Sequence, residues 1–266
     1  MVTGASGGIG AWIARALARA GMNVGLCARR EDALEAVAGE LRDLGVRAQT
    51  VAADLAAVEE LDAVIGRAEA ELGPLDVLVN NAGIEIAAAF TRYSRDELTA
   101  MVDLNLVAPM LLTHRVLPGM LERGRGHVVF VASVAGKQGP AYEAPYAATK
   151  AGLVGLTQAL RAEHLHSPVG FSAVCPGFVA GEGMYERMLQ QGVASNRLMG
   201  STTIEKVAER VVEAIRRDVP EILESGTPLR PVLALGQLAP RLAERTAARI
   251  GATDIFRRMA AINGRE

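Results

Sequence analysis

Apolar positions follow two alternating spacings from the first residues to about residue 225. Short apolar runs rich in β-branched residues are typical of buried strands. These runs are Asn23–Ala28, Ala48–Ala53, Leu75–Asn80, His127–Ala132, Val169–Cys175 and Glu221–Leu223. Between them, as in residues 9–20 and 34–44, apolar residues recur at helical spacing. Because strands alternate with helices, the pattern predicts an α/β fold with a doubly wound parallel sheet covered by helices on both faces.

The two ends of the chain depart from this alternation. The chain begins Met1-Val2-Thr3-Gly4, so its first strand is unusually short, or the natural protein starts upstream. Residues 226–266 carry seven Arg and three acidic residues, a net charge of +4 against −6 for the preceding part. An apolar stripe at helical spacing runs through them: Leu235, Leu238, Ala239 and Leu242. We expect a single domain in which residues 1–225 form the main part and residues 226–266 form a C-terminal helical tail packed on it.

Composition and charge narrow the class of protein. Half of the 266 residues are apolar, enough to bury a core. Lys plus Arg is 28 against 30 Asp plus Glu, so nucleic acid is not an expected partner. No run of 18 apolar residues exists, so we expect no transmembrane segment, although the basic tail leaves open a weak peripheral contact with a membrane surface. Cys27 and Cys175 are interpreted as buried thiols, which indicates a cytoplasmic location.

A glycine-rich turn stands at the first junction of strand and helix. Its sequence is Thr3-Gly4-Ala5-Ser6-Gly7-Gly8-Ile9-Gly10. Glycines allow a tight turn and close approach of a pyrophosphate, which the N–H groups of the helix N-terminus attract. The alternative is a plain turn between a strand and a helix. The position at the first βα junction favours a dinucleotide site.

Tyr146 and Lys150 form a candidate acid–base pair. Their i, i+4 spacing places both side chains on one helix face. A nearby ammonium lowers the pKa of a phenol, so this Tyr is suited to exchange a proton with a carbonyl or alcohol oxygen. Ser133 ends a predicted strand, where its hydroxyl can hold the substrate oxygen. Taken singly, the Tyr/Lys pair is more often a surface feature and Ser133 a strand-end cap. The four histidines lack metal-ligand spacing, so we expect no metal site.

The ordered set of motifs resembles the classical short-chain dehydrogenase/reductase family. The glycine turn is followed by Asn80-Asn81-Ala82-Gly83, Asn105, Ser133, Tyr146-Ala-Ala-Thr-Lys150 and Pro176-Gly177. The resemblance covers residues 1–225. It implies a Rossmann-type fold and an oxidoreductase acting on CH–OH and C=O groups. It also implies the catalytic residues Asn105, Ser133, Tyr146 and Lys150, with Lys150 binding the nicotinamide ribose and Asn105 holding a water.

The resemblance also assigns a cofactor site. The implied binding residues are Gly4, Ser6, Gly8, Ile9, Gly10, Arg29, Arg30, Asp54, Leu55, Asn81, Ala82, Gly83, Tyr146, Lys150, Pro176, Gly177 and Val179. The second strand ends in Arg29-Arg30 where an acid would select NAD, and Arg suits the 2′-phosphate of NADP. Two positions depart from the family: Gly7, where many NADP enzymes carry a basic residue, and Gly181, where Thr is common. We expect NADP(H) to be preferred over NAD(H).

The expected substrate is a hydrophobic, fairly bulky ketone or secondary alcohol. Met184 and Met188 share a helix face after Gly181 and are predicted to contact it together with Ser133 and Tyr146. The alternative is that these methionines simply pack in the core. Family members commonly pair through the helices around Asn105 and Tyr146, so a homodimer or homotetramer is expected. Alternative functions are a non-catalytic dinucleotide-sensing regulator, which typically lacks the Tyr and Lys, and another chemistry on this fold.

Overall fold

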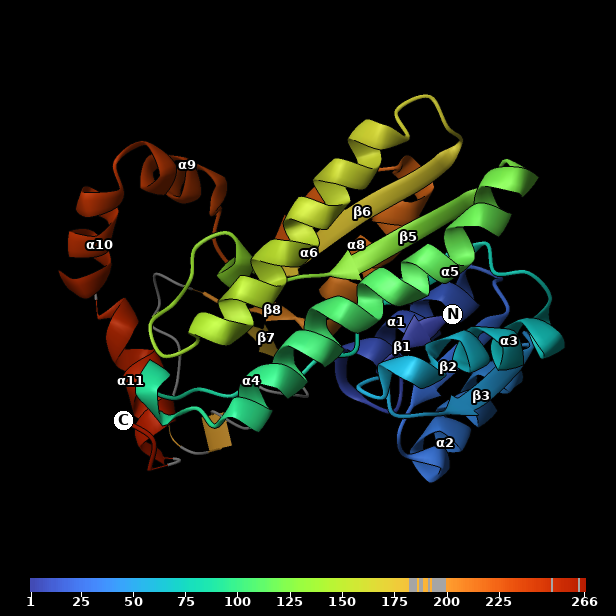
Figure 1. The fold of residues 1–266 in the computed structure, drawn as a ribbon, viewed down its shortest axis with the longest axis horizontal. Coiled ribbons are helices and arrows are strands. Elements are labelled where there is room, and N and C mark those ends of the chain that lie inside the picture. The colour runs from blue at the N-terminus through green and yellow to red at the C-terminus, as the bar shows by residue number, and fades with distance from the viewer. Residues whose placement is uncertain (182–185, 187–188, 191, 193–199, 250, 263) are drawn as a thin grey trace.

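A seven-stranded parallel sheet forms the centre of the computed structural model, which describes residues 1–181, 186, 189–190, 192, 200–249, 251–262 and 264–266 (Figure 1). Its strand order is β3-β2-β1-β4-β5-β6-β9. The strands are β1 (Val2–Thr3), β2 (Val24–Ala28), β3 (Ala48–Ala52), β4 (Val77–Asn80), β5 (Gly126–Val131), β6 (Val169–Pro176) and β9 (Glu221–Glu224). Each of the six runs read from the sequence matches one of these strands to within two residues at either end. The central strand β1 has two residues, and its short length matches the pattern of the sequence.

Helices cover both faces of the sheet, as the alternating pattern predicted. One face is covered by α3 (Leu61–Leu72), α5 (Ala108–Arg123) and α6 (Ala144–Glu163). The other is covered by α1 (Gly8–Arg19), α2 (Glu31–Asp43) and α8 (Ile204–Arg217). Both layers bury apolar side chains against the near-continuous apolar strands. This is the doubly wound Rossmann-type arrangement, and the predicted fold class is confirmed.

The strand order reverses beside β1, because β2 and β3 lie on one side of it and β4, β5 and β6 on the other. In a doubly wound sheet, ligands bind beyond the carboxyl ends of the strands at such a switch point. The glycine turn follows β1, and Asn81 follows β4 at the same edge. The topology therefore gathers the predicted site residues at one edge of the sheet.

The C-terminal part of the chain lies at the far end of the molecule from α2 and α3 (Figure 1). It forms α9 (Arg230–Leu238), α10 (Pro240–Arg249) and α11 (Ala252–Ile262). Ile255 and Phe256 of α11 are buried against Tyr142 and Phe178. Val232, Leu235, Leu238 and Leu242, on α9 and α10, are exposed.

Arg265 ties this part of the chain to the short helix α4 (Arg95–Val102). Its guanidinium makes two hydrogen bonds to the Glu97 carboxylate, at 2.7 and 2.6 Å, and these hold the pKa of Glu97 at about 2. The Arg265 carbonyl also accepts a bond from the Ala89 N–H at 2.8 Å. The last residues are thus fixed to the segment that precedes α4.

The continuous helical segment 95–123 is long and apolar enough to span a membrane by length and composition, which the sequence pattern did not predict. About 39% of its most apolar window is buried. Met101, Asn105, Leu112 and Met120 pack inside the fold. Length and composition alone therefore do not establish a membrane span for it.

The buried side chain of His127 makes the stability of the fold depend on pH. It is 6% exposed, and its Nε2 lies 2.9 Å from the Ser172 Oγ. Burial lowers the pKa of His127 from 6.5 to about 4. The unfolded chain takes up this proton below pH 6.5 and the folded one only near pH 4. Its stabilising contribution is therefore present above pH 6.5 and is lost as the pH falls toward 4.

We expect His127→Gln to flatten the fall in stability over this window. The wild-type chain should lose about 2–3 kcal/mol more than the variant between the two pKa values. Urea unfolding at several pH values measures the difference. His114→Gln, at an exposed position on α5, is the control. Parallel curves for wild type and His127→Gln would contradict this assignment.

Candidate active site

The glycine turn between β1 and α1 forms an open cradle. A Cβ on Gly10 would lie 2.2 Å from the Gly4 carbonyl oxygen, and one on Gly4 would lie 2.9 Å from the Ala82 Cα. These two positions therefore require glycine for close packing. Gly8 has a φ of +53° and would meet nothing within 4 Å. The N–H groups at the start of α1 belong to this turn, where they fit the pyrophosphate of a dinucleotide.

Thr3 locks this turn to the end of β4. Its Oγ1 accepts hydrogen bonds from the N–H groups of Asn81 and Ala82 at 2.9 and 3.0 Å. The Asn81 Nδ2 donates back to the Thr3 carbonyl at 2.9 Å. The hydroxyl is inside the fold, because Thr3 is 2% exposed. Two strands that are far apart in sequence are joined here by one side chain.

Asn105 lies in a π-helical turn, Asp103–Val107, between α4 and α5. It is completely buried. Its Oδ1 accepts from the Ile84 N–H and its Nδ2 donates to the Ile84 carbonyl, both at 2.8 Å. The same Nδ2 lies 3.3 Å from the Thr149 Oγ1 on α6. The side chain of Asn105 therefore holds the segment after Gly83 against α6. Its implied role in holding a water stays a prediction.

Ser133, Tyr146 and Lys150 come together. Tyr146 and Lys150 lie one turn apart at the start of α6, and both are buried. The Lys150 Nζ lies 5.6 Å from the centre of the Tyr146 ring and donates a 2.9 Å bond to the Val131 carbonyl. The Ser133 hydroxyl is in hydrogen-bond contact with the Tyr146 phenol. Gly83 belongs to the same group, since a Cβ there would lie 3.6 Å from the Lys150 Nζ.

Burial shifts the two acid–base groups in opposite directions. It raises the pKa of Tyr146 well above 10, with further increases from the charges of Glu85 and Glu143. It lowers the pKa of Lys150 to about 8. The spacing of Tyr146 and Lys150 predicted a lowered phenol pKa, and that expectation is wrong for this structure. Desolvation of the phenolate outweighs the neighbouring ammonium, so Tyr146 holds its proton at neutral pH.

The remaining cofactor positions lie around the same edge of the sheet. Arg30 is exposed, and its Nη2 donates a 3.4 Å bond to the Ser6 carbonyl across the glycine turn. Arg29 is also exposed. The Asp54 Oδ1 accepts from the Ala56 N–H at 3.1 Å. The others lie nearby in the fold: Ile9 half-buried on α1, Leu55 buried after β3, Pro176 and Gly177 at the end of β6, and Val179 in β7 (Val179–Ala180). Met184 and Met188 lie outside the described residues.

Two acidic residues near Tyr146 were not predicted from the sequence. Glu85 follows Gly83 by two residues, and Glu143 precedes Tyr146 by three. Burial raises the pKa of Glu143 well above 4.5, with further increases from the charge of Glu85 and a hydrogen bond between the two carboxyl groups. Their closeness in sequence to Gly83 and Tyr146 was the only signal for them, because the sequence does not show that these two segments meet in the fold.

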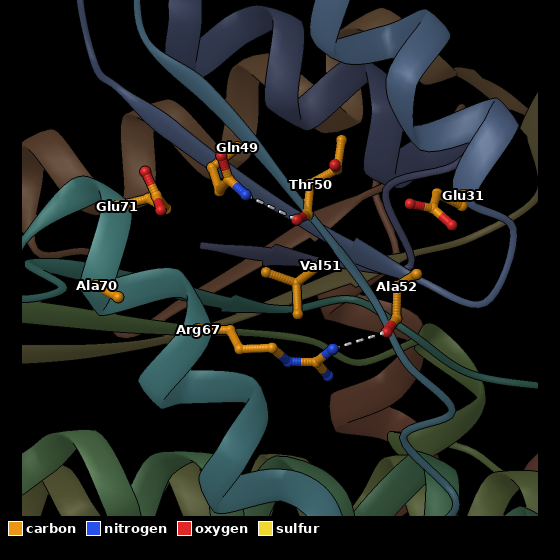
Figure 2. A pocket seen from close by; sticks show the side chains of 8 residues that line it. All are labelled: Glu31, Gln49, Thr50, Val51, Ala52, Arg67, Ala70 and Glu71. Atoms are coloured by element: carbon orange, nitrogen blue, oxygen red, sulfur yellow. Dashed lines mark hydrogen bonds between the residues drawn. The ribbon is translucent and has the colours of Figure 1, made fainter.

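An open groove of about 510 Å³ lies elsewhere, along the edge strand β3 (Figure 2). Arg67 of α3 crosses it and donates a 3.4 Å bond to the Ala52 carbonyl. Glu31 and Glu71 lie at its two ends. None of the predicted catalytic residues lines it, so this groove does not mark the reaction site. Among the described residues, no group of three or more His, Cys, Asp or Glu side chains is arranged to hold a metal.

A family model for short chain dehydrogenases matches residues 1–191. The chain belongs to the short-chain dehydrogenase family. The prediction that it is an enzyme, a short-chain oxidoreductase acting on C=O and CH–OH groups, is thereby confirmed. The ketoacyl reductase HetN of Nostoc sp. is 37% identical over 265 residues, 98% of this chain and 91% of that protein. An acetoacetyl-CoA reductase of Shinella zoogloeoides is 36% identical over 210 residues, covering 79% and 84% of the two chains.

Solved structures of other short-chain dehydrogenases share the fold. A variant of actinorhodin polyketide ketoreductase with NADPH matches with a TM-score of 0.76 and 35% identity, covering 85% of this chain and 94% of that one. A metagenomic short-chain oxidoreductase in complex with NADP matches with a TM-score of 0.72 and 34% identity, covering 85% and 96%.

The two hydrogen bonds that the Thr3 hydroxyl accepts give a prediction for the stability of this short-chain dehydrogenase. Thr3→Val keeps the shape but leaves two buried N–H groups without an acceptor, which should lower the free energy of unfolding by about 2–4 kcal/mol. Thr3→Ser retains the oxygen and should lose much less. Urea unfolding of both variants measures this. A Val variant that loses no more stability than the Ser variant would show that the hydroxyl does not hold the turn.

Proposed function

We propose that this chain is an NADP(H)-dependent oxidoreductase that transfers a hydride between the nicotinamide and a hydrophobic ketone or secondary alcohol, with Tyr146 as the acid–base group. The observation that carries the proposal is the contact of the Ser133 and Tyr146 hydroxyls beside the Lys150 ammonium. This group lies next to Gly83, at the edge of the sheet that holds the glycine cradle. Ketoacyl reductases among the relatives support a carbonyl substrate.

The residues present fit a dinucleotide. Gly4 and Gly10 let the turn pack closely, a Cβ on Gly8 would meet nothing within 4 Å, and Asn81 holds the turn in place. When bound, the nicotinamide supplies or accepts the hydride. The 17 positions assigned from the resemblance are proposed as its binding site, with Lys150 near the ribose.

In the reducing direction, Tyr146 donates its proton to the carbonyl oxygen as that oxygen becomes an alcohol. Its raised pKa keeps the phenol protonated for this step. The Ser133 hydroxyl holds the same oxygen and stabilises its developing charge. The Lys150 ammonium then stabilises the phenolate that remains. Asn105 positions these groups by holding Ile84 and Thr149.

A hydrophobic substrate is supported by the apolar cluster near Tyr142. Phe178 and Phe256 stack there with ring centres 6.0 Å apart, and Leu189 and Met259 pack beside them. The cluster joins the segment after Pro176-Gly177 to α11. We propose that residues 1–225 and the tail 226–266 act as one domain in which the tail completes the substrate side.

The regulator alternative is not favoured, because Tyr146 and Lys150 are both present and in contact. We also propose a homodimer or homotetramer, supported by exposed apolar side chains on the segment 95–123: Val102, Met110, Leu111 and Leu121. A cytoplasmic location remains a proposal that rests on the thiols of Cys27 and Cys175, which are both free and buried. A weak membrane contact of the tail is supported only by its arginines and the exposed leucines of α9 and α10.

Tyr146→Phe tests the proposed reaction. The ring stays and the proton donor is removed, so reduction of a simple aryl ketone with NADPH should fall by at least about a hundredfold, while NADPH binding persists. Steady-state kinetics and a fluorescence titration of NADPH measure the two effects. Turnover within a few-fold of wild type would assign the proton donor to another group.

Arg30→Ala tests the preference for NADP(H). Arg30 lies across the glycine turn, where a guanidinium can pair with a 2′-phosphate, so its loss should raise the KM for NADPH by about tenfold or more and change that for NADH little. Arg29→Ala should act in the same direction. Both KM values are measured for each variant. Equal increases for the two cofactors would refute the assignment.

A further inference from the structure

Two carboxyl groups that the proposed mechanism does not use lie beside Tyr146. The side chain of Glu143 is inside the fold, and the residue is 2% exposed. Its Oε1 has no hydrogen-bond partner among the described residues. Its carboxyl group is in hydrogen-bond contact with that of Glu85, and the charges of both act on the Tyr146 phenol. A buried acceptor without a donor is rare and needs an explanation.

Helix capping does not explain the burial of Glu143. The residue occupies the N-cap position of α6, but its side chain makes no capping bond. Tyr142, directly before it, has a φ of 65°, a strained conformation for a bulky residue. The Tyr142 carbonyl is held in place by the Ala88 N–H and the Tyr93 hydroxyl, both at 2.9 Å. The backbone is thus constrained in a way that keeps Glu143 where it is.

Glu85 is fixed from both sides. The preceding Ile84 is held at its N–H and its carbonyl by Asn105. The carbonyl of the following residue, Ile86, accepts a 2.5 Å bond from the Tyr93 hydroxyl. Tyr93 therefore binds the backbone next to both carboxylates. The pair is a built feature of the site and not a chance approach of two mobile side chains.

The protonation of Glu143 follows from its surroundings. Burial and the negative charge of Glu85 raise the pKa of Glu143 well above 4.5, so its carboxyl group keeps its proton at neutral pH. The hydrogen bond to Glu85 uses that proton and leaves the Oε1 of Glu143 as an acceptor. The charges of the two residues act on the Tyr93 and Tyr146 phenols, and that of Glu85 acts on the Lys150 ammonium.

We propose that the Oε1 of Glu143 is a substrate-binding group, which accepts a hydrogen bond from a hydroxyl or N–H of the substrate close to the reacting carbonyl. The negative charge of Glu85 excludes substrates with a carboxylate at that position. The substrate class is thus a mainly apolar, uncharged ketone with one hydrogen-bond donor near its carbonyl. This inference rests on the proposed function, since it describes the same site.

Matched ketones test the donor. The set is an aryl ketone, its α- and β-hydroxy derivatives, and the methyl ethers of those two. Their affinities are measured by calorimetry on the protein loaded with NADP⁺, and their reduction rates with NADPH. The wild type should bind the better hydroxy ketone about tenfold more tightly than its methyl ether. Absence of this preference in both pairs would overturn the proposal.

Variants of Glu143 separate the effect of the hydrogen-bond acceptor from the effect of side-chain shape. Glu143→Gln keeps a carbonyl oxygen and can donate its N–H to Glu85, so the preference should remain. Glu143→Met has a similar shape and no such acceptor, so the ratio should fall to about one. Glu122→Gln, exposed on α5, removes a charge elsewhere and is the control. A Met variant that binds NADPH and keeps the wild-type ratio would overturn the proposal.

The α-keto acid of the same aryl series tests the charge. Glu143→Gln keeps the charge of Glu85 and should exclude the acid as the wild type does. The double variant Glu85→Gln/Glu143→Gln has neither carboxyl group and should bind the acid at least about tenfold more tightly than Glu143→Gln. No gain in the double variant would refute the exclusion. This arm does not depend on the Met variant folding.

The two readouts distinguish this proposal from the proposed function. If no ketone is reduced while the donor preference appears in binding, the proposed reaction fails and the binding site stands. If the plain ketone is reduced with no donor preference, the reaction stands and the binding site fails.

Discussion

The whole edge of the sheet depends on the hydroxyl of Thr3. The central strand β1 has only two residues, so few ladder hydrogen bonds hold it between β2 and β4. The chain then turns sharply at Gly4, where the backbones approach more closely than any side chain would allow. A single oxygen, bonded to two N–H groups of the neighbouring strand, fixes this turn. This contact therefore determines where the glycine turn and the start of α1 lie.

The chemistry beyond this edge arises from burial. In a medium of low polarity, each acid–base group is shifted toward its neutral form. Tyr146 therefore keeps its proton at neutral pH. The pKa of Lys150 is about 8, so its ammonium group loses its proton only slightly above neutral pH. The two shifts move the pKa values of the phenol and the ammonium apart. Glu143 follows the same rule, because burial raises the pKa of its carboxyl group well above 4.5.

The sequence was sufficient for the elements and for the motif residues, because both depend on local pattern. The strand positions follow from apolar runs, and Tyr146 and Lys150 share a helix face by spacing alone. The direction of the Tyr146 pKa was wrong, since desolvation depends on side chains from several distant segments. Glu85 and Glu143 were missed for the same reason: 58 positions separate two residues that meet only through the fold. The contact of Arg30 with the Ser6 carbonyl was not foreseen either, because it joins segments that only the fold brings together.

The π-helical turn at Asp103–Val107 limits how this enzyme can vary. A π turn contains one residue more than an α turn, and here it lies within a continuous helix. A π turn takes up one extra residue while the flanking helices keep their directions, so deleting one residue would restore regular α geometry within the turn. Asn105 and the other side chains of the turn could then no longer keep their present directions relative to the exposed apolar side chains of α5. The number of residues in this segment is thus constrained as firmly as their identity, so that divergence here should proceed by substitution and not by insertion or deletion.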